Sequence, residues 1–87
     1  MYHIDYDTRA AEVLEKIQKR DREAIKTRID KLAEDPRPHG VEPLRGELAG
    51  YYRIRFGDYR IMYEVRDTKL LVVVVKIGNR KDIYKKR

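Results

Sequence analysis

Apolar residues in the first third of the chain recur at the spacing of a helix. Residues 10–17 place apolar side chains at i, i+3, i+4 and i+7, which predicts an amphipathic helix. The members of this stripe are Ala10, Val13, Leu14 and Ile17. Asp7 or Thr8 precedes the stripe, and either side chain can cap the start of the helix.

The same spacing resumes further along the chain and predicts a second helix. A break near Arg20 separates the two, and Asp21 is the expected cap of the second helix. Its apolar positions are Ile25, Ile29 and Leu32. We expect the helix to end at Asp35-Pro36, because the residue before a proline is disfavoured in the α region.

The remaining apolar positions have the patterns of strands. Weak alternation from Tyr2 to Tyr6 predicts a short first strand. The segment from Leu70 to Ile77 is apolar at nearly every position, which predicts a central strand covered on both faces. Between them, Tyr51 to Val65 alternates apolar and polar residues on either side of a turn signal.

That turn signal fixes how two strands pair. Gly57 and Asp58 predict a two-residue hairpin turn, since glycine accepts the positive φ that the first central position requires. If Phe56 faces Tyr59, then Arg55 faces Arg60. Facing residues project to the same side of a sheet.

The predicted register separates the hairpin side chains into two faces. One face carries the apolar residues Ile54, Phe56, Ile61 and Tyr63. The other carries Arg53, Arg55 and Arg60. Like charges directly opposite each other destabilise an antiparallel pair, so we expect an anionic ligand to relieve this arrangement.

The order of elements predicts an α+β fold. An N-terminal strand and a helical hairpin pack on one face of a mainly antiparallel, four-stranded twisted sheet, followed by a short basic C-terminal tail. Residues 1–87 are expected to form a single domain. The proline-rich segment 36–50 is predicted to be a functional loop, pinned to the core by Leu44 and Leu48.

Composition favours an anionic partner. The formal net charge is +6, and the last ten residues carry five cations against one carboxylate. A solvated terminus that is kept basic for solubility explains the tail equally well. The chain has no cysteine, no signal-peptide pattern and no apolar run that could span a bilayer, so we expect a cytoplasmic protein without membrane contact.

The available side chains exclude several chemistries. The two histidines, His3 and His39, lie far apart, and serine and cysteine are absent, which excludes a thiolate metal site and a serine triad. No glycine-rich phosphate loop precedes a helix, and no cofactor is expected. What remains is arginines and tyrosines, which suit phosphodiester recognition. In RNA the 2′-hydroxyl can supply the nucleophile, although an exposed arginine more commonly faces solvent or pairs with a carboxylate.

The segments YRIRFGDYRIMYEV and GNRKDIY, with Leu44-Arg45-Gly46 before them, resemble the RelE/ParE toxin superfamily, in particular its RelE branch. The resemblance implies the toxin of a type II toxin–antitoxin system, a metal-independent endoribonuclease that cuts ribosome-bound mRNA in the A site through 2′-hydroxyl attack on the adjacent phosphate. It also implies a cognate antitoxin that blocks the site and carries the complex to operator DNA. The residues that correspond to the family's site are Arg53, Arg55, Arg60, Arg80 and Tyr84.

One departure from the family leaves the proton acceptor open. Well-studied members carry lysines where this chain has Arg53 and Arg55, and arginine does not release its proton near neutral pH. Either the chemistry relies on phosphate positioning and charge, or Glu64, Tyr84 or a ribosomal group helps.

Two other functions fit the same fold. A ParE-like toxin would inhibit DNA gyrase by protein–protein binding and cut nothing. A degenerate homologue would only bind an antitoxin or RNA. The basic set Arg55, Arg60 and Arg80 argues against the gyrase inhibitor, whose branch generally lacks it.

Overall fold

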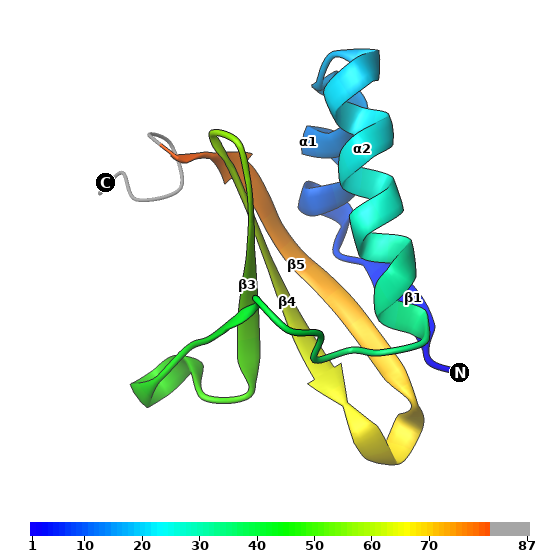
Figure 1. Cartoon of the computed structure of the whole chain (residues 1–87), viewed down its shortest axis with the longest axis vertical. Coiled ribbons are helices and arrows are strands. Elements are labelled where there is room, and N and C mark those ends of the chain that lie inside the picture. The colour runs from blue at the N-terminus through cyan, green and yellow to red at the C-terminus, as the bar shows by residue number, and fades with distance from the viewer. Residues whose placement is uncertain (81–87) are drawn as a thin grey trace.

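The computed structural model describes residues 1–80, which form two helices packed against a five-stranded sheet (Figure 1). The elements follow in the order β1 (His3–Tyr6), α1 (Thr8–Lys16), α2 (Lys19–Asp30), β2 (Glu42–Pro43), β3 (Tyr51–Phe56), β4 (Tyr59–Arg66) and β5 (Leu71–Asn79). In the sheet the strand order is β1-β5-β4-β3-β2, and only the pairing of β1 with β5 is parallel. The predicted α+β fold is confirmed. The sheet has one more strand than predicted.

Helix α1 begins where it was predicted to begin. Helix α2 begins and ends earlier than predicted, at Lys19 and Asp30. Asp7 caps α1, and its carboxylate accepts a hydrogen bond from the backbone N–H of Arg9 at 2.8 Å. The break between the helices comes earlier than Arg20, at Ile17 and Gln18, because Ile17 adopts an extended backbone and turns into the core. Asp21 therefore lies in the first turn of α2 and is not its cap, so that prediction was wrong.

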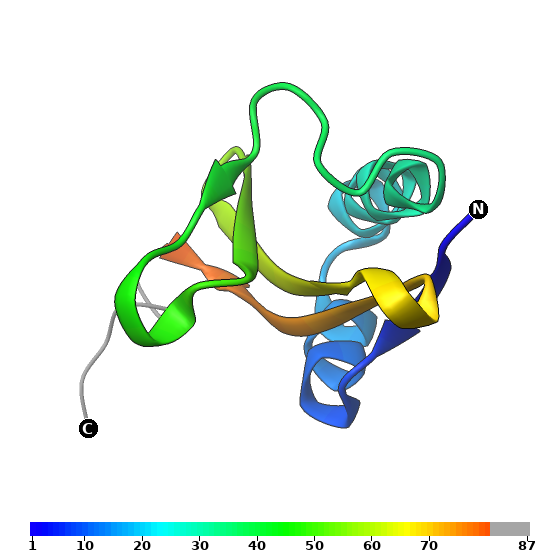
Figure 2. The same ribbon diagram turned by 90° about the horizontal axis from the view of Figure 1, so that it is seen from below.

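Both helices lie on the same face of the sheet, as Figures 1 and 2 show. The core between the two layers is built from the predicted helical stripes and the buried face of the strands. Its fully buried large side chains are Tyr63, Ile25, Ile29, Leu32, Ile61, Val72 and Val74. Val13, by contrast, is 37% exposed and lies at the margin of the core. None of the helices in residues 1–80 is long and apolar enough to cross a membrane.

Strand β5 is interior but is covered on one face only. It lies between β1 and β4, and β4 is the middle strand of the sheet. Val72, Val74 and Ile77 are buried, whereas the alternate residues Val73 and Val75 are only half-buried. The prediction of cover on both faces was wrong, because the run of valines reflects β propensity on the open face as well as burial beneath the helices.

The proline-rich loop is pinned to the core by different residues from those predicted. Leu48 is 44% exposed, and the backbone N–H of Leu44 bonds to the carbonyl oxygen of Tyr51. The anchor is Pro36, which is buried and whose carbonyl oxygen accepts a hydrogen bond of 2.8 Å from the buried hydroxyl of Tyr63. Val41 also packs against the core. The hydrogen bond at Pro36 therefore holds the start of the loop in place, and β2 follows six residues later in the chain.

Candidate active site

The site is organised by the β3–β4 hairpin, whose register is the predicted one. Gly57 has a φ of 56°, as the first central position of the turn requires. Arg55 pairs with Arg60, and Arg53 pairs with Met62. Since Ile54 and Ile61 point into the core, the arginine positions lie on the opposite face of the sheet, away from the helices.

Arg53 and Arg55 converge on one carboxylate, that of Glu42. The Nε and Nη2 atoms of Arg53 lie 3.2 and 2.8 Å from Oε1 of Glu42, and Nη2 of Arg55 lies 3.3 Å from the same oxygen. Glu42 reaches them because β2 pairs antiparallel with β3 and places it directly opposite Arg53. Part of the charge repulsion on this face is therefore relieved by the chain itself.

The two arginines differ in how far they are exposed. The Arg53 side chain is 16% exposed and that of Arg55 is 61% exposed, with Glu42 at 44% between them. Together with Gly40, Val41 and Pro43 they line an open groove of about 430 Å³. Arg55 is thus the cation that an incoming anion meets first, and Arg53 forms the floor.

The electrostatics of Glu42 follow from these contacts. The hydrogen bond from Arg53, with the positive charges of Arg53 and Arg55, holds the pKa of the Glu42 carboxyl below its ordinary value. Glu42 is therefore ionised at neutral pH and forms ion pairs with both arginines.

Arg60 has a different environment from its two neighbours. Its side chain is largely buried and bends toward the hairpin turn, where Nη1 donates to the carbonyl oxygens of Gly57 at 2.9 Å and Tyr59 at 2.8 Å. The predicted register is confirmed, but the three guanidinium groups do not all meet at one point. Arg60 also braces the turn.

Arg80 comes close to the hairpin turn. Its backbone N–H donates to the carbonyl oxygen of Asp58 in the turn, and β5 pairs with β4 up to the match of Asn79 with Tyr59. Figure 1 shows the hairpin tip and the end of β5 at the same end of the sheet. The Arg80 side chain is exposed. Tyr84 lies outside the described residues.

Tyrosines of the hairpin contribute to the core and its rim. Tyr63 is fully buried, and its ring stacks on that of Tyr52 with 5.6 Å between centroids. Arg37 lies over the Tyr52 ring and donates to its hydroxyl at 2.8 Å. Its guanidinium also binds Asp67 at 2.7 Å, which ties the proline-rich loop to the end of β4.

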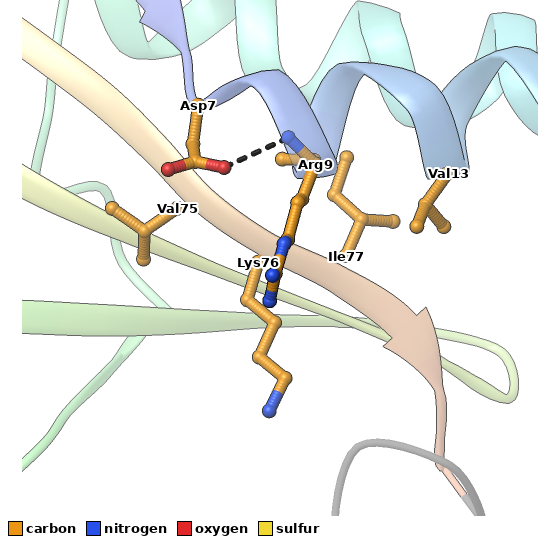
Figure 3. Close-up of a pocket in the computed structure, with 7 residues that line it drawn as sticks. Asp7, Arg9, Val13, Val75, Lys76 and Ile77 are labelled. Carbon is orange, nitrogen blue, oxygen red and sulfur yellow. Dashed lines mark hydrogen bonds between the residues drawn. The ribbon is translucent and has the colours of Figure 1, made fainter.

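A second hollow adjoins the Glu42 groove and shares Gly40, Val41 and Arg55 with it, whereas a third lies apart from Glu42. This groove, of about 410 Å³, lies between α1 and β5. Arg9, Val13 and Lys76 are among the residues that line it (Figure 3). It lies toward the β1 edge of the sheet, opposite the β2 edge. Within residues 1–80 no three His, Asp or Glu side chains are grouped so that they could hold a metal ion.

The arrangement can bind a phosphate group. Guanidinium groups donate to phosphate oxygens in a fixed fork and stay charged at any physiological pH. Glu42 is the residue that sequence reasoning missed, because it lies in a segment with the prolines of a loop. The available signal was a carboxylate beside Pro43, since proline is tolerated in an edge strand that pairs on one side only.

Comparison with known proteins shows that the chain is similar to toxins of toxin–antitoxin systems. A family profile described as the ParE toxin of the type II toxin–antitoxin system parDE matches residues 4–84. Toxin RelG of Mycobacterium tuberculosis is 34% identical over 98% of both chains. The mRNA interferase toxin RelE of Escherichia coli is 34% identical over 91% of this chain and 83% of its own. The crystal structure of the intact Escherichia coli RelBE toxin–antitoxin complex matches with a TM-score of 0.81 and 30% identity, covering 100% of both chains.

Proposed function

Because the chain belongs to the ParE toxin family of type II toxin–antitoxin systems, as a RelE-like member, we propose that it is a ribosome-dependent endoribonuclease that cuts mRNA. The observation that carries the proposal is the pair Arg53 and Arg55, which already bind an anionic group in an open groove. A phosphodiester presents the same kind of charged oxygen to these cations.

The arginines divide the work of binding and stabilisation. Arg55, the exposed member, captures the scissile phosphate, and Arg53 holds a second oxygen from below. Arg80, which is exposed beside the hairpin turn, stabilises the charge that develops on the phosphate during 2′-hydroxyl attack. Arg60 supports the site by holding the turn. By the resemblance, Tyr84 stacks against a base of the substrate.

Primer extension on mRNA from a translation reaction tests the cleavage. New 5′ ends should appear within A-site codons when the protein is added. Arg55→Ala should reduce cleavage by about 10²–10³-fold, the range found when a single charge-stabilising donor is removed. Arg66→Ala is the matched control, because Arg66 is an exposed arginine paired with Glu64 on β4. Arrested translation without new 5′ ends would refute the proposal.

The proposed partners follow from the same assignment. The protein binds the ribosome and mRNA as substrate, and it binds a cognate antitoxin that blocks the groove. The complex binds operator DNA through the antitoxin, and the toxin acts in the cytoplasm, where its substrate is. Size-exclusion chromatography of the toxin co-expressed with the neighbouring gene's product tests the antitoxin.

A second candidate is a gyrase inhibitor that acts by protein binding alone. The observation in its favour is that the matching family profile is that of the ParE toxin. A DNA supercoiling assay with purified gyrase decides between the two. Inhibition of supercoiling without cleavage of mRNA would support this candidate. A homologue that only binds its antitoxin would be inactive in both assays and would not arrest growth.

A further inference from the structure

The arginines of the site cannot themselves take a proton. Attack by a 2′-hydroxyl requires that its proton leave, and a guanidinium cannot accept it because it already carries its full complement of protons. Arg53 and Arg55 are both of this kind. Proton transfer by a positioned group typically contributes about 10²–10⁴-fold to a rate, so the identity of the acceptor matters.

Glu42 is the carboxylate that meets both arginines. Its Oε1 atom lies 2.8 Å from Nη2 of Arg53 and 3.3 Å from Nη2 of Arg55. Its other oxygen, Oε2, takes part in neither of these ion pairs, and the residue lines the open groove. Because the arginines are the groups that grip the scissile phosphate, a hydroxyl on the adjacent ribose comes within reach of this carboxylate.

Within residues 1–80, Glu64 also lies on this face, but its carboxylate binds a different arginine. Glu64 pairs with Tyr51 in the sheet register, two positions from Met62, which pairs with Arg53. Its carboxylate binds Arg66 at 3.0 Å. Glu64 therefore lies beside the site on the sheet, but its ion pair is with Arg66 and not with Arg53 or Arg55.

We propose that Glu42 is the general base of the reaction. This assignment rests on the proposed function. Oε2 of Glu42 takes the proton of the 2′-hydroxyl while the 2′-oxygen forms a bond to phosphorus. The bond from phosphorus to the 5′-oxygen breaks, and the 5′-oxygen leaves with a proton from water. Glu42 then returns its proton to water, so the products are a 2′,3′-cyclic phosphate and a 5′-hydroxyl, and no co-reactant is consumed.

Substrate binding itself makes this carboxylate a better base. In the free protein, the hydrogen bond from Arg53 and the charges of Arg53 and Arg55 keep the Glu42 pKa low. When the phosphate takes up these donors, Glu42 loses hydrogen bonds and gains a negative neighbour, and both changes raise its pKa. The base is weak while the site is empty and is strengthened when the phosphate is in place.

Glu42→Gln is the decisive variant, since the amide oxygen still accepts from both arginines but cannot take the proton. We expect single-turnover cleavage of ribosome-bound mRNA to slow by about 10²–10⁴-fold, with ribosome binding within about twofold of wild type. Glu47→Gln removes an equal charge from an exposed residue of the same loop and should cleave as wild type does.

The pH dependence separates a base from a structural group. The wild-type rate at saturation should fall on the acidic side with a higher apparent pKa than kcat/KM shows, because kcat reports the complex and kcat/KM the free protein. Among residues 1–80, the charged groups in contact with Glu42 are Arg53 and Arg55 on β3. Glu42→Gln should lose the acidic limb.

The outcomes are distinguishable. If wild type cleaves and Glu42→Gln cleaves equally fast, Glu42 is not the base, while the proposed function stands. If wild type does not cleave, the proposed function fails and the inference fails with it. Should Glu42→Gln not fold, Glu42→Asp and the pH profile of wild-type cleavage decide. Partial activity of Glu42→Asp together with a wild-type kcat that falls toward acid pH supports the inference. A wild-type kcat that stays flat toward acid pH overturns it.

Discussion

The hydrogen bond between Tyr63 and Pro36 joins the middle strand of the sheet to the loop that carries Glu42. The Tyr63 side chain is fully buried, and burial also raises the pKa of its phenol, so the hydroxyl remains a donor at physiological pH. Tyr63→Phe keeps the ring and its stacking on Tyr52 but removes the donor. The carbonyl oxygen of Pro36 is then left buried without its partner.

Leaving a buried acceptor unsatisfied costs about 1–3 kcal/mol. In a domain of this size 1 kcal/mol corresponds to roughly 4–8 °C in Tm, so even the lower bound is easily measured. Tyr52→Phe is the matched control, because the hydroxyl of Tyr52 bonds to an exposed arginine, Arg37, whose nitrogen water can solvate instead. We expect that variant to lose less than about 1 kcal/mol.

Urea unfolding of both variants tests the argument, and amide hydrogen exchange locates the effect. Tyr63→Phe should unfold at the lower urea concentration and should also speed exchange at Val41 and Glu42, since the loop has lost its anchor. Equal midpoints for the two variants would refute the idea that the Pro36 bond matters more than the surface bond of Tyr52.

Three further stability predictions follow, each measured by urea unfolding. Hydrogen bonds from Arg37 hold the pKa of Asp67 below its usual 3.8, so ionised Asp67 stabilises the folded state. This contribution is present above pH 3.8 and is lost as the pH falls through the folded-state pKa, so Asp67→Asn should flatten the decline of the free energy of unfolding at acid pH. Gly57→Ala should cost about 1–2 kcal/mol from positive φ alone, since nothing lies within 4 Å of the added carbon; an unchanged midpoint would contradict this. Asp7→Ala should cost about 1 kcal/mol as a lost cap, and Asp21→Ala markedly less.

The hairpin and its register could be predicted from sequence because the information is local. Gly57 and Asp58 set the turn, and a period of two then fixes which side chains share a face. The approach of Arg80 to the turn, by contrast, depends on the pairing of β5 with β4. The hairpin register depends on few residues and requires no knowledge of the rest of the chain.

The missed features depend on contacts between distant segments. β2 contains two residues, one of them Pro43, and only its pairing with β3 makes it a strand. Glu42 belongs to the site through that pairing alone. The start of α2 was misplaced because Gln18 makes no side-chain capping bond, so the local signal at Asp21 was the stronger one. The open face of β5 could not be read from its valines, which suit either environment.

The parallel pairing of β1 with β5 has a consequence for the order of synthesis. His3 to Tyr6 pair with Leu71 to Val74, so β1 has no partner in the sheet until the residues of β5 have been synthesised. Pairing between such distant segments also forms slowly compared with a local hairpin. A nascent chain can therefore form the β3–β4 hairpin before β5 has been made, but it closes the sheet and brings Arg80 to the turn only after that strand has been synthesised.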